Sequence, residues 1–289
     1  LRILENETPH TSFLKISEGC DHTCAFCAIP SFRGLHRSAP LSELVAEAQA
    51  LCHQGVQEVN IISQDTTWYG RDLKRKDPKA PLLPELLGAL VQDTDIPWFR
   101  LFYMYPSGIT QGIIELIGDD NSILPYLDMP IQHGSDKILK SMRRPESQKI
   151  IRERVQWLRD WVPDLTLRTT VIVGFPGETD DDVRQTIDFA KQIDADYYSL
   201  SVLAPYYGTE LYNQLIKKPV KSLWTCSSKT ILSTEIFCQI WLYLKKSLIR
   251  TWLTSYLWLN LSNTKKEKFF ALMLKKNRGF ILHTQDNLS

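Results

Sequence analysis

The sequence predicts an α/β fold, a partial (β/α)6 barrel of the TIM type, over residues 1–215. Short apolar runs alternate with helix-like segments, and polar or glycine-rich groups follow the apolar runs. Such alternation is typical of parallel strands joined by helical crossovers. Because six βα repeats can be counted and a closed barrel uses eight, we expect an open barrel.

The expected strands are short apolar or β-branched runs, and helical periodicity fills the intervals between them. The strands are expected at 13–17, 58–63, 98–104, 125–129, 166–173 and 197–203. The helices are expected at 41–54, 82–92, 110–118, 135–143, 148–161, 179–193 and 208–217. Ser and Thr cap helices, and acidic residues favour the positive amino end, so helices are expected to start at Ser42, Thr110 and Thr179.

Charge divides the chain in two. Residues 1–215 carry 21 Lys and Arg against 30 Asp and Glu, whereas residues 216–289 carry 13 against 3 and hold four of the eight tryptophans. A basic, Trp-rich tail can bind nucleic acid or a ribosome surface, or be a solvated end. The six cysteines do not form a secreted disulfide scaffold and no signal peptide opens the chain, so we expect a cytoplasmic protein.

The tail, residues 216–289, is predicted to be a second unit of uncertain fold, either helical or disordered. It contains no glycine before Gly279, which argues against tight β-turns. Its apolar runs are too short for a transmembrane helix, so no transmembrane span is expected. The interpretations are a non-native sequence from a frameshift or misjoined gene, a divergent interaction helix, or a membrane-surface helix.

Three cysteines spaced CxxxCxxC, Cys20, Cys24 and Cys27, follow the first predicted strand. A [4Fe–4S] cluster usually takes four thiolates, so three would leave one iron open to a small chelating ligand. S-adenosylmethionine, with its amino and carboxylate groups, suits such an iron. The alternatives are a zinc site completed by His22 or His53, or structural cysteines that form part of a disulfide framework.

Polar or glycine-rich groups follow the other five strands, where active sites of such barrels lie. Each is an ordinary turn by itself, but together they suit a ligand-binding funnel, and Gly174 and Gly177 would let the backbone approach a ligand closely. The groups are Gln64–Thr66, Tyr105–Ser107, Gln132–Ser135, Gly174–Thr179 and Tyr206–Thr209.

The chain resembles the methylthiotransferase family of radical S-adenosylmethionine enzymes over roughly residues 8–195. The stretch 62–70, ISQDTTWYG, is similar to the branch that methylthiolates an aspartate of ribosomal protein S-twelve. The matching stretches are 15–34 (KISEGCDHTCAFCAIPSFRG), 125–135 (PYLDMPIQHGS), 138–145 (ILKSMRRP) and 167–179 (LRTTVIVGFPGET).

The resemblance implies that Cys20, Cys24 and Cys27 ligate the cluster. It places Phe26 near the adenine, and Gly174, Gly177 and Glu178 at the adenosine site. Gln132, Ser135 and Arg143 are implied as cofactor or cluster neighbours, and Asp65 as a contact of the ribose or substrate. The alternatives are loop packing for Phe26, a basic helix terminus for Arg143-Arg144 and a turn group for Asp65.

The resemblance also implies a mechanism and partners. One electron delivered to the cluster cleaves S-adenosylmethionine to a 5′-deoxyadenosyl radical, and the family inserts sulfur with a second [4Fe–4S] cluster. The ligands of that cluster are expected to be absent here, since Cys52, Cys226 and Cys238 do not form a matching triad. The implied partners are a ribosomal protein or the ribosome, and a reductant such as a flavodoxin or ferredoxin.

Two other hypotheses remain at this point. One is a methylthiotransferase that acts on tRNA, or another radical S-adenosylmethionine enzyme. The other is a truncated, catalytically incomplete cluster-binding protein, since residue 1 is Leu rather than Met.

Overall fold

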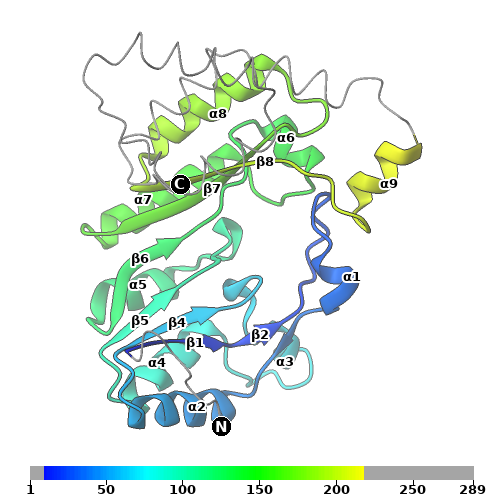
Figure 1. Cartoon of the computed structure of the whole chain (residues 1–289). Helices are drawn as coiled ribbons and strands as arrows, with labels where there is room; N and C mark the ends of the chain where they lie inside the picture. Colours follow the sequence, from blue (N-terminus) through cyan, green and yellow to red (C-terminus); the bar gives the residue numbers. More distant parts are fainter. Residues whose placement is uncertain (1–9, 218–289) are drawn as a thin grey trace, which may run out of the picture.

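The computed structural model describes residues 10–217, and its six main strands form one curved, parallel sheet (Figure 1). The strand order follows the sequence, β1-β4-β5-β6-β7-β8, with β1 and β8 at the two edges. The predicted open α/β barrel of six strands is therefore confirmed. The strands are β1 (Thr11–Lys15), β4 (Glu58–Ile62), β5 (Trp98–Leu101), β6 (Ile123–Asp128), β7 (Thr166–Val173) and β8 (Tyr197–Val202).

Helices cover the outer face of the sheet, and consecutive helices pack on one another around the arc (Figure 1). Side chains alternate between the two faces along β7, where Leu167, Val171 and Val173 are buried in the main core. The helices are α2 (Leu41–His53), α4 (Leu83–Asp93), α5 (Gln111–Asp119), α6 (Asp136–Ser141), α7 (Gln148–Trp161), α8 (Asp180–Ile193) and α9 (Glu210–Lys217).

The helix starts expected from capping residues are right in two cases of three. Thr179 is the N-cap of α8 and accepts a hydrogen bond from the backbone N–H of Asp182. Thr110 is the N-cap of α5, although its hydroxyl makes no capping bond. Ser42 lies inside α2, whose N-cap is Pro40, so that expected start is wrong. A proline already has the fixed φ that an extended N-cap needs.

Several short elements were not expected, because two to five residues are too few to show a period. They are β2 (Ser17–Glu18), β3 (Arg37–Ser38), α1 (Ile29–Arg33), α3 (Arg71–Lys74) and the 3-10 turns η1 (Thr66–Trp68) and η2 (Pro106–Gly108). β2 pairs with β3 in an antiparallel ribbon outside the main sheet. The first strand of the barrel therefore ends at Lys15, earlier than expected.

The tail lies almost entirely outside the described residues, together with Cys226 and Cys238. The domain boundary at residue 215 and the nature of the tail stay predictions. Among residues 10–217, no helix is both long and apolar enough to cross a membrane.

Gly19 stands immediately before the first cysteine, in a backbone conformation that favours glycine. Its φ is +78°, and a Cβ there would lie 2.2 Å from the Leu35 carbonyl oxygen and 2.6 Å from that of Gly34. The β2–β3 ribbon thus requires a residue without a side chain at this position.

Replacement of Gly19 by alanine is expected to lower the free energy of unfolding by ~3 kcal/mol or more. The alanine would be strained at this positive φ, and its Cβ would also force nearby backbone atoms to move. Gly55 is the matched control, since its φ is +85° and a Cβ there meets no atom within 4 Å. Gly55→Ala should cost only ~1–2 kcal/mol, the strain alone. Urea denaturation of both variants checks this, and equal losses would contradict the close approach.

Candidate active site

The three predicted cysteines lie on one loop that follows β1 and β2, near the carboxyl ends of the barrel strands. The Cys20 N–H donates to the Gly34 carbonyl over 3.1 Å, and the Cys27 N–H donates to the Cys24 carbonyl over 3.1 Å. Cys20 and Cys24 are each 6% exposed, and Cys27 is half-buried. Backbone hydrogen bonds therefore order the loop that carries the three thiols, at the end of the barrel where chemistry is expected.

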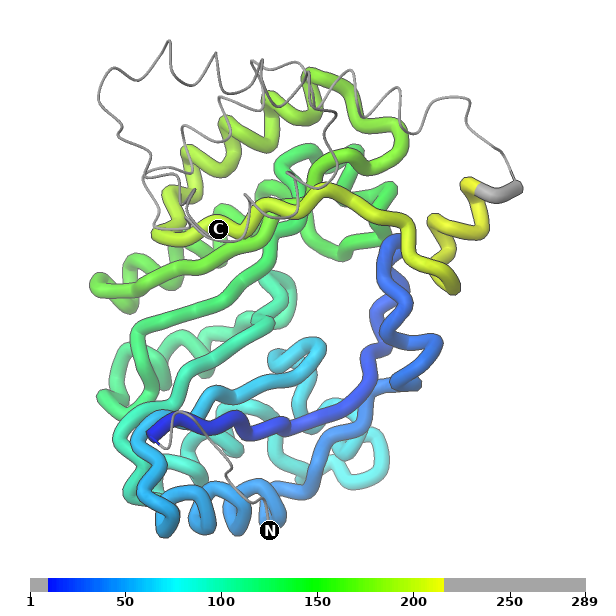
Figure 2. The backbone as a smooth tube through the Cα atoms, viewed as in Figure 1, coloured from blue at the N-terminus to red at the C-terminus, as the bar shows by residue number. Residues whose placement is uncertain are grey.

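Ala25, between the second and third cysteines, ties this loop to two distant elements. Its N–H donates to the Met142 carbonyl after α6 over 3.0 Å, and its carbonyl accepts from the Leu211 N–H of α9 over 3.0 Å. Its side chain packs in a small apolar cluster with Ile138, Met142, Phe175 and Leu211. Figure 2 shows the cysteine loop, in blue, beside α9 in yellow. We call these contacts the Ala25 clamp.

His22, between the first and second cysteines, braces the loop against the barrel. Its Nε2 donates to Asp65 Oδ2 over 2.7 Å, and its ring stacks on Tyr105 with centroids 4.3 Å apart and planes 3° apart. Asp65 is 1% exposed, and its Oδ1 accepts from the backbone N–H and the hydroxyl of Thr67. Both carboxylate oxygens of Asp65 thus have protein partners, and its contact with a ribose or substrate stays a prediction.

The chemistry of the thiols fits an iron–sulfur cluster. Burial raises the pKa of Cys20 to about 11 and also raises the pKa of the Cys27 thiol. Without a metal these thiols are protonated at neutral pH, so iron must displace the protons when it binds. The Arg144 guanidinium lies 3.9 Å from Cys24 Sγ, where it complements a bound thiolate. Three thiols with a cationic neighbour suit a cluster ligated at three of its irons.

The other interpretations of the cysteines gain no support from the structure. Cys20, Cys24, Cys27 and Cys52 are all free, so the described cysteines form no disulfide framework. His53 ends α2, which leads back to the amino end of β4, opposite the cysteine loop. Within residues 10–217, no group of three or more His, Cys, Asp or Glu side chains is arranged to hold a single metal ion.

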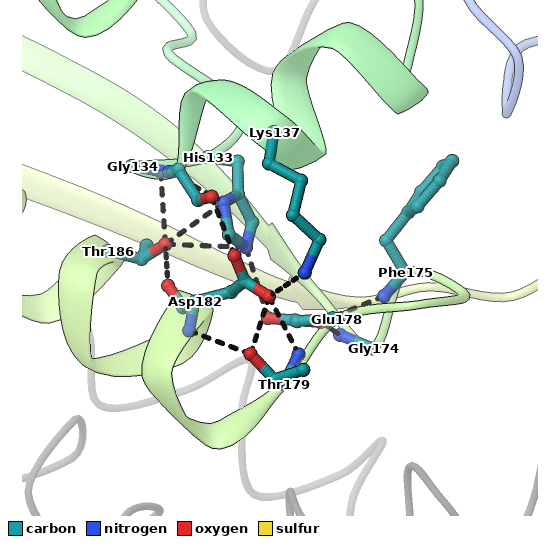
Figure 3. Close-up of polar contacts among 10 residues, drawn as sticks. His133, Gly134, Lys137, Gly174, Phe175, Glu178, Thr179, Asp182 and Thr186 are labelled. Atoms are coloured by element: carbon teal, nitrogen blue, oxygen red, sulfur yellow. Dashed lines mark hydrogen bonds and ion pairs between the residues drawn. The ribbon is translucent and has the colours of Figure 1, made fainter.

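A buried network joins the loops that follow β6 and β7 (Figure 3). The Ser135 N–H donates to His133 Nδ1 over 2.9 Å, so the ring proton lies on Nε2, which donates to Glu178 Oε1 over 3.0 Å. Glu178 Oε2 accepts from the backbone N–H groups of Gly174 and Phe175. Glu178 therefore fixes the backbone conformation of the loop after β7. Its predicted contact with the adenosine stays a prediction.

Asp182, in the first turn of α8, is the second centre of this network (Figure 3). It accepts hydrogen bonds from the Ser135 hydroxyl (2.7 Å), the Lys137 ammonium (2.6 Å) and the Thr179 hydroxyl (2.6 Å). Burial by itself favours the neutral acid, but these donors hold the pKa of Asp182 well below its usual range. Ser135 is thus committed to Asp182, and its predicted role at the cofactor stays a prediction.

The depressed pKa of Asp182 predicts an acid-dependent contribution to stability. The contribution is full above the unfolded pKa of ~4 and declines as the pH falls below it towards the folded pKa. Asp182→Asn is therefore expected to cost ~1–3 kcal/mol at pH 7 and about 1 kcal/mol less at pH 3, which is roughly one unit below the unfolded pKa. Urea denaturation of the metal-free protein and its variant at the two pH values checks this. A constant difference between the two proteins would contradict it.

Gln132 has the strongest structural signal among the predicted cofactor residues. Its φ is +66°, and its backbone is held to β7 by hydrogen bonds to the Thr170 carbonyl (2.9 Å) and from the Ile172 N–H (2.7 Å). Its side-chain Oε1 is buried without a hydrogen-bond partner. Strained backbone and an unpaired acceptor at one position are typical of a binding site.

The remaining predicted residues lie around the same end of the barrel. Phe26 is partly buried against the apolar cluster of the Ala25 clamp. Gly174 and Gly177, with φ of +83° and +86°, form the turn after β7, where a glycine relieves strain. Their contacts with S-adenosylmethionine stay predictions.

Arg144, and not the predicted Arg143, is the arginine that lies beside a cysteine, and a contact of Arg143 with the cofactor stays a prediction. Arg143 has a φ of +58° and is 48% exposed, and it lies 3.8 Å from Glu210 of α9. Its neighbour Arg144 is buried against Cys24, as noted above. Glu146, which pairs with Arg144, was missed entirely. The sequence does contain a signal for Glu146, since it follows Arg144 by two residues, with Pro145 between them, within the region of family resemblance.

These features define a class of protein: an open (β/α)6 barrel that carries a three-cysteine loop at the carboxyl ends of its strands. Comparison with known families makes this specific, because the Radical SAM superfamily matches residues 14–190. The chain therefore belongs to the radical S-adenosylmethionine superfamily. The cofactors of this superfamily are a [4Fe–4S] cluster and S-adenosylmethionine.

Curated relatives share the same stretch of sequence. The ribosomal protein uS12 methylthiotransferase RimO of Sulfurihydrogenibium sp. (strain YO3AOP1) is 45% identical over 205 residues, which are 71% of this chain and 47% of that protein. RimO of Geobacter sulfurreducens is 47% identical over 206 residues, 71% of this chain and 45% of that protein. The chain thus spans less than half the length of these relatives.

Solved structures share the fold at low sequence identity. The radical S-adenosylmethionine methyltransferase TsrM from Kitasatospora setae, with cobalamin and a [4Fe–4S] cluster bound, matches with a TM-score of 0.58 and 18% identity, over 72% of this chain and 39% of that one. The cobalamin-dependent S-adenosylmethionine radical enzyme OxsB matches with a TM-score of 0.61 and 10% identity, over 91% and 45%. Both likenesses support the barrel architecture alone.

Proposed function

We propose that this protein is a radical S-adenosylmethionine methylthiotransferase that adds a methylthio group to an aspartate of a small-subunit ribosomal protein. The proposal rests on identities of 45–47% to proteins named for that reaction. The structural observation that carries it is the braced loop with Cys20, Cys24 and Cys27 at the mouth of the barrel, beside a buried cation. Positions 62–70, which resemble the protein-modifying branch, favour a protein over tRNA as substrate.

Cys20, Cys24 and Cys27 would ligate the cluster in this proposal. When bound and reduced, the cluster would supply the electron for reductive cleavage of S-adenosylmethionine. Gln132 offers its unpaired Oε1 as an acceptor for the amino group or a hydroxyl of the cofactor. The turn at Gly174 and Gly177, fixed by Glu178, offers backbone next to the adenosine.

The protein residues otherwise orient the cofactor and exclude water. The Ala25 clamp attaches the cysteine loop to α6 and α9, and the hydrogen bond from His22 attaches it to Asp65 after β4. Such preorganisation would hold a bound cofactor close to one C–H bond of the substrate.

The partners in this proposal are a ribosomal protein and an external one-electron reductant such as a flavodoxin or ferredoxin, and the compartment is the cytoplasm. Exposed basic side chains lie on α1, β3 and α3 and just after α3, and one of them, Arg75, lies 3.7 Å from Asp21 of the cysteine loop. Basic side chains there suit an acidic electron carrier. These side chains are Arg33, Arg37, Arg71, Lys74, Arg75 and Lys76.

The first test is anaerobic reconstitution of the chain with iron and sulfide, followed by reduction and electron paramagnetic resonance with and without S-adenosylmethionine. A four-iron signal that changes when the cofactor is added supports the open-iron site. An absent signal, or one indifferent to the cofactor, contradicts it and favours an incomplete cluster-binding protein.

The second test measures thiomethylation of ribosomal protein uS12 and of tRNA by mass spectrometry. We expect a mass increase on an aspartate-containing peptide of the ribosomal protein. Modification of tRNA alone would overturn the substrate assignment and leave the radical chemistry in place.

A further inference from the structure

Tyr105 and Arg144 converge on a single sulfur atom, that of Cys24. The Tyr105 hydroxyl and Arg144 Nη1 each lie 3.9 Å from Cys24 Sγ. The Arg144 guanidinium lies 3.8 Å from the centroid of the Tyr105 ring, which also stacks on His22. A cation and a hydroxyl group thus both lie beside the sulfur of Cys24. The Arg144 charge also acts on the Cys27 thiol.

Arg144 is held in this position by contacts on its other atoms. Its side chain is 1% exposed, and its Nε lies 3.0 Å from Glu146 Oε2 as an ion pair that lacks hydrogen-bond geometry. Its Nη2 donates to the Pro130 carbonyl over 3.4 Å. Glu146 in turn accepts from the Ser107 hydroxyl through its Oε1 over 2.9 Å. These partners fix the direction in which Nη1 points.

The buried charge of Arg144 interacts with any charge that Cys24 carries. A cation buried in low dielectric interacts strongly with any charge nearby, and Glu146 offsets part of its field. One-electron reduction of a cluster, by an external donor, adds one negative charge that the sulfur ligands share. Nearby net charge and hydrogen bonds to the sulfurs set the reduction potential of such clusters.

We propose that Arg144, with the Tyr105 hydroxyl, raises the reduction potential of the cluster by stabilising the added negative charge at the sulfur of Cys24. Glu146 opposes this effect and tunes it. The inference rests on the proposed function, because it requires that Cys24 ligates a cluster. Arg144 is a positioning and electrostatic residue in this role and touches no substrate.

The proposal predicts shifts of opposite sign for neighbouring residues. Arg144→Met should disfavour reduction about tenfold, which for one electron is ~59 mV towards lower potential. Tyr105→Phe keeps the aromatic stack and should shift the potential in the same direction by less. Glu146→Gln removes the opposing charge and should shift the potential upwards. A general loosening of the site would not produce both signs.

The chain offers a matched control in Arg100. Its Nε lies 2.6 Å from Glu58 Oε1, and its guanidinium lies 4.6 Å from the centroid of the Tyr126 ring. Arg100 thus has the same kinds of partners as Arg144, but its Glu58 is at the amino end of β4, away from the cysteine loop. Arg100→Met should leave the potential unchanged.

The measurement is a redox titration of the reconstituted full chain, with mediators and dithionite, followed by electron paramagnetic resonance in the absence of S-adenosylmethionine. If the wild-type chain assembles no cluster, that result contradicts the proposed function and not the charge effect of Arg144. Where the cluster assembles, unchanged potentials in Arg144→Met, Tyr105→Phe and Glu146→Gln overturn the inference, as does an equal shift in Arg100→Met.

Two further outcomes are decisive. If Arg144→Met does not load a cluster, the Tyr105→Phe and Glu146→Gln variants decide, and opposite shifts support the inference whereas no shift overturns it. If the potentials are unchanged and Arg144→Met only weakens binding of S-adenosylmethionine, Arg144 is a ligand of the cofactor carboxylate and the inference is wrong.

Discussion

Replacement of Cys24 by alanine is expected to abolish reductive cleavage of S-adenosylmethionine, with a loss of at least ~10³-fold or ~4 kcal/mol in transition-state stabilisation. Cys24 is the buried middle thiol of the loop, and it alone contacts both Tyr105 and Arg144 among the described cysteines. Loss of one of three thiolates leaves two iron atoms of the cluster without protein ligands. Iron and sulfide content, together with formation of 5′-deoxyadenosine, measures the effect.

Cys52→Ala is the control for this variant. Cys52 is free and half-buried in α2, on the outer side of the sheet, and it packs against the main core. Its loss should cost some stability and leave iron content and cofactor cleavage near the wild-type level. Retained cleavage in Cys24→Ala, or equal loss in both variants, would remove the case for the cysteine loop as the cluster site.

Replacement of Glu178 by alanine is expected to destabilise the fold by ~3–5 kcal/mol, because it leaves several buried donors without a hydrogen-bond partner. His133 Nε2 and the N–H groups of Gly174 and Phe175 all donate to this carboxylate (Figure 3). Without it the loop after β7 loses its shape, so binding of S-adenosylmethionine should weaken as well. Urea denaturation and isothermal titration of the reconstituted protein with S-adenosylmethionine measure the two effects.

Glu178→Gln separates the charge of this residue from its shape. The amide keeps one carbonyl acceptor for the backbone N–H groups or for His133, so it should recover part of the lost stability and cofactor affinity. Full stability in Glu178→Ala would contradict the bracing role. Loss of cofactor affinity without loss of stability would show instead that Glu178 contacts the cofactor directly.

The regular part of the fold was predictable because its elements are long enough to show their periods. The expected bounds 166–173 and 148–161 coincide with β7 and α7. Errors occurred where a local backbone conformation overrides the pattern. The third strand was expected to reach residue 104, but it ends at Leu101 and Tyr103 follows with a φ of +56°. Apolar character continues there, and the strand does not.

The site was predictable in position and less so in its contacts. Residues that follow parallel strands meet at one end of a barrel, which is why Cys20, Asp65 and Gln132 could be grouped from their order in the chain. Which of two adjacent arginines reaches the cysteines could not be predicted in this way. The choice depends on the left-handed backbone at Arg143, which turns that side chain towards α9 and Arg144 towards Cys24.

The Ala25 clamp has a consequence for the order of events during biosynthesis. The cysteines are among the first residues of the barrel to leave the ribosome, whereas the Leu211 N–H that completes the clamp belongs to the last described helix. Contacts between residues so distant in sequence form late, since loop closure must come first. The contacts that hold the cysteine loop are therefore expected to be complete only after the chain has been made as far as residue 211.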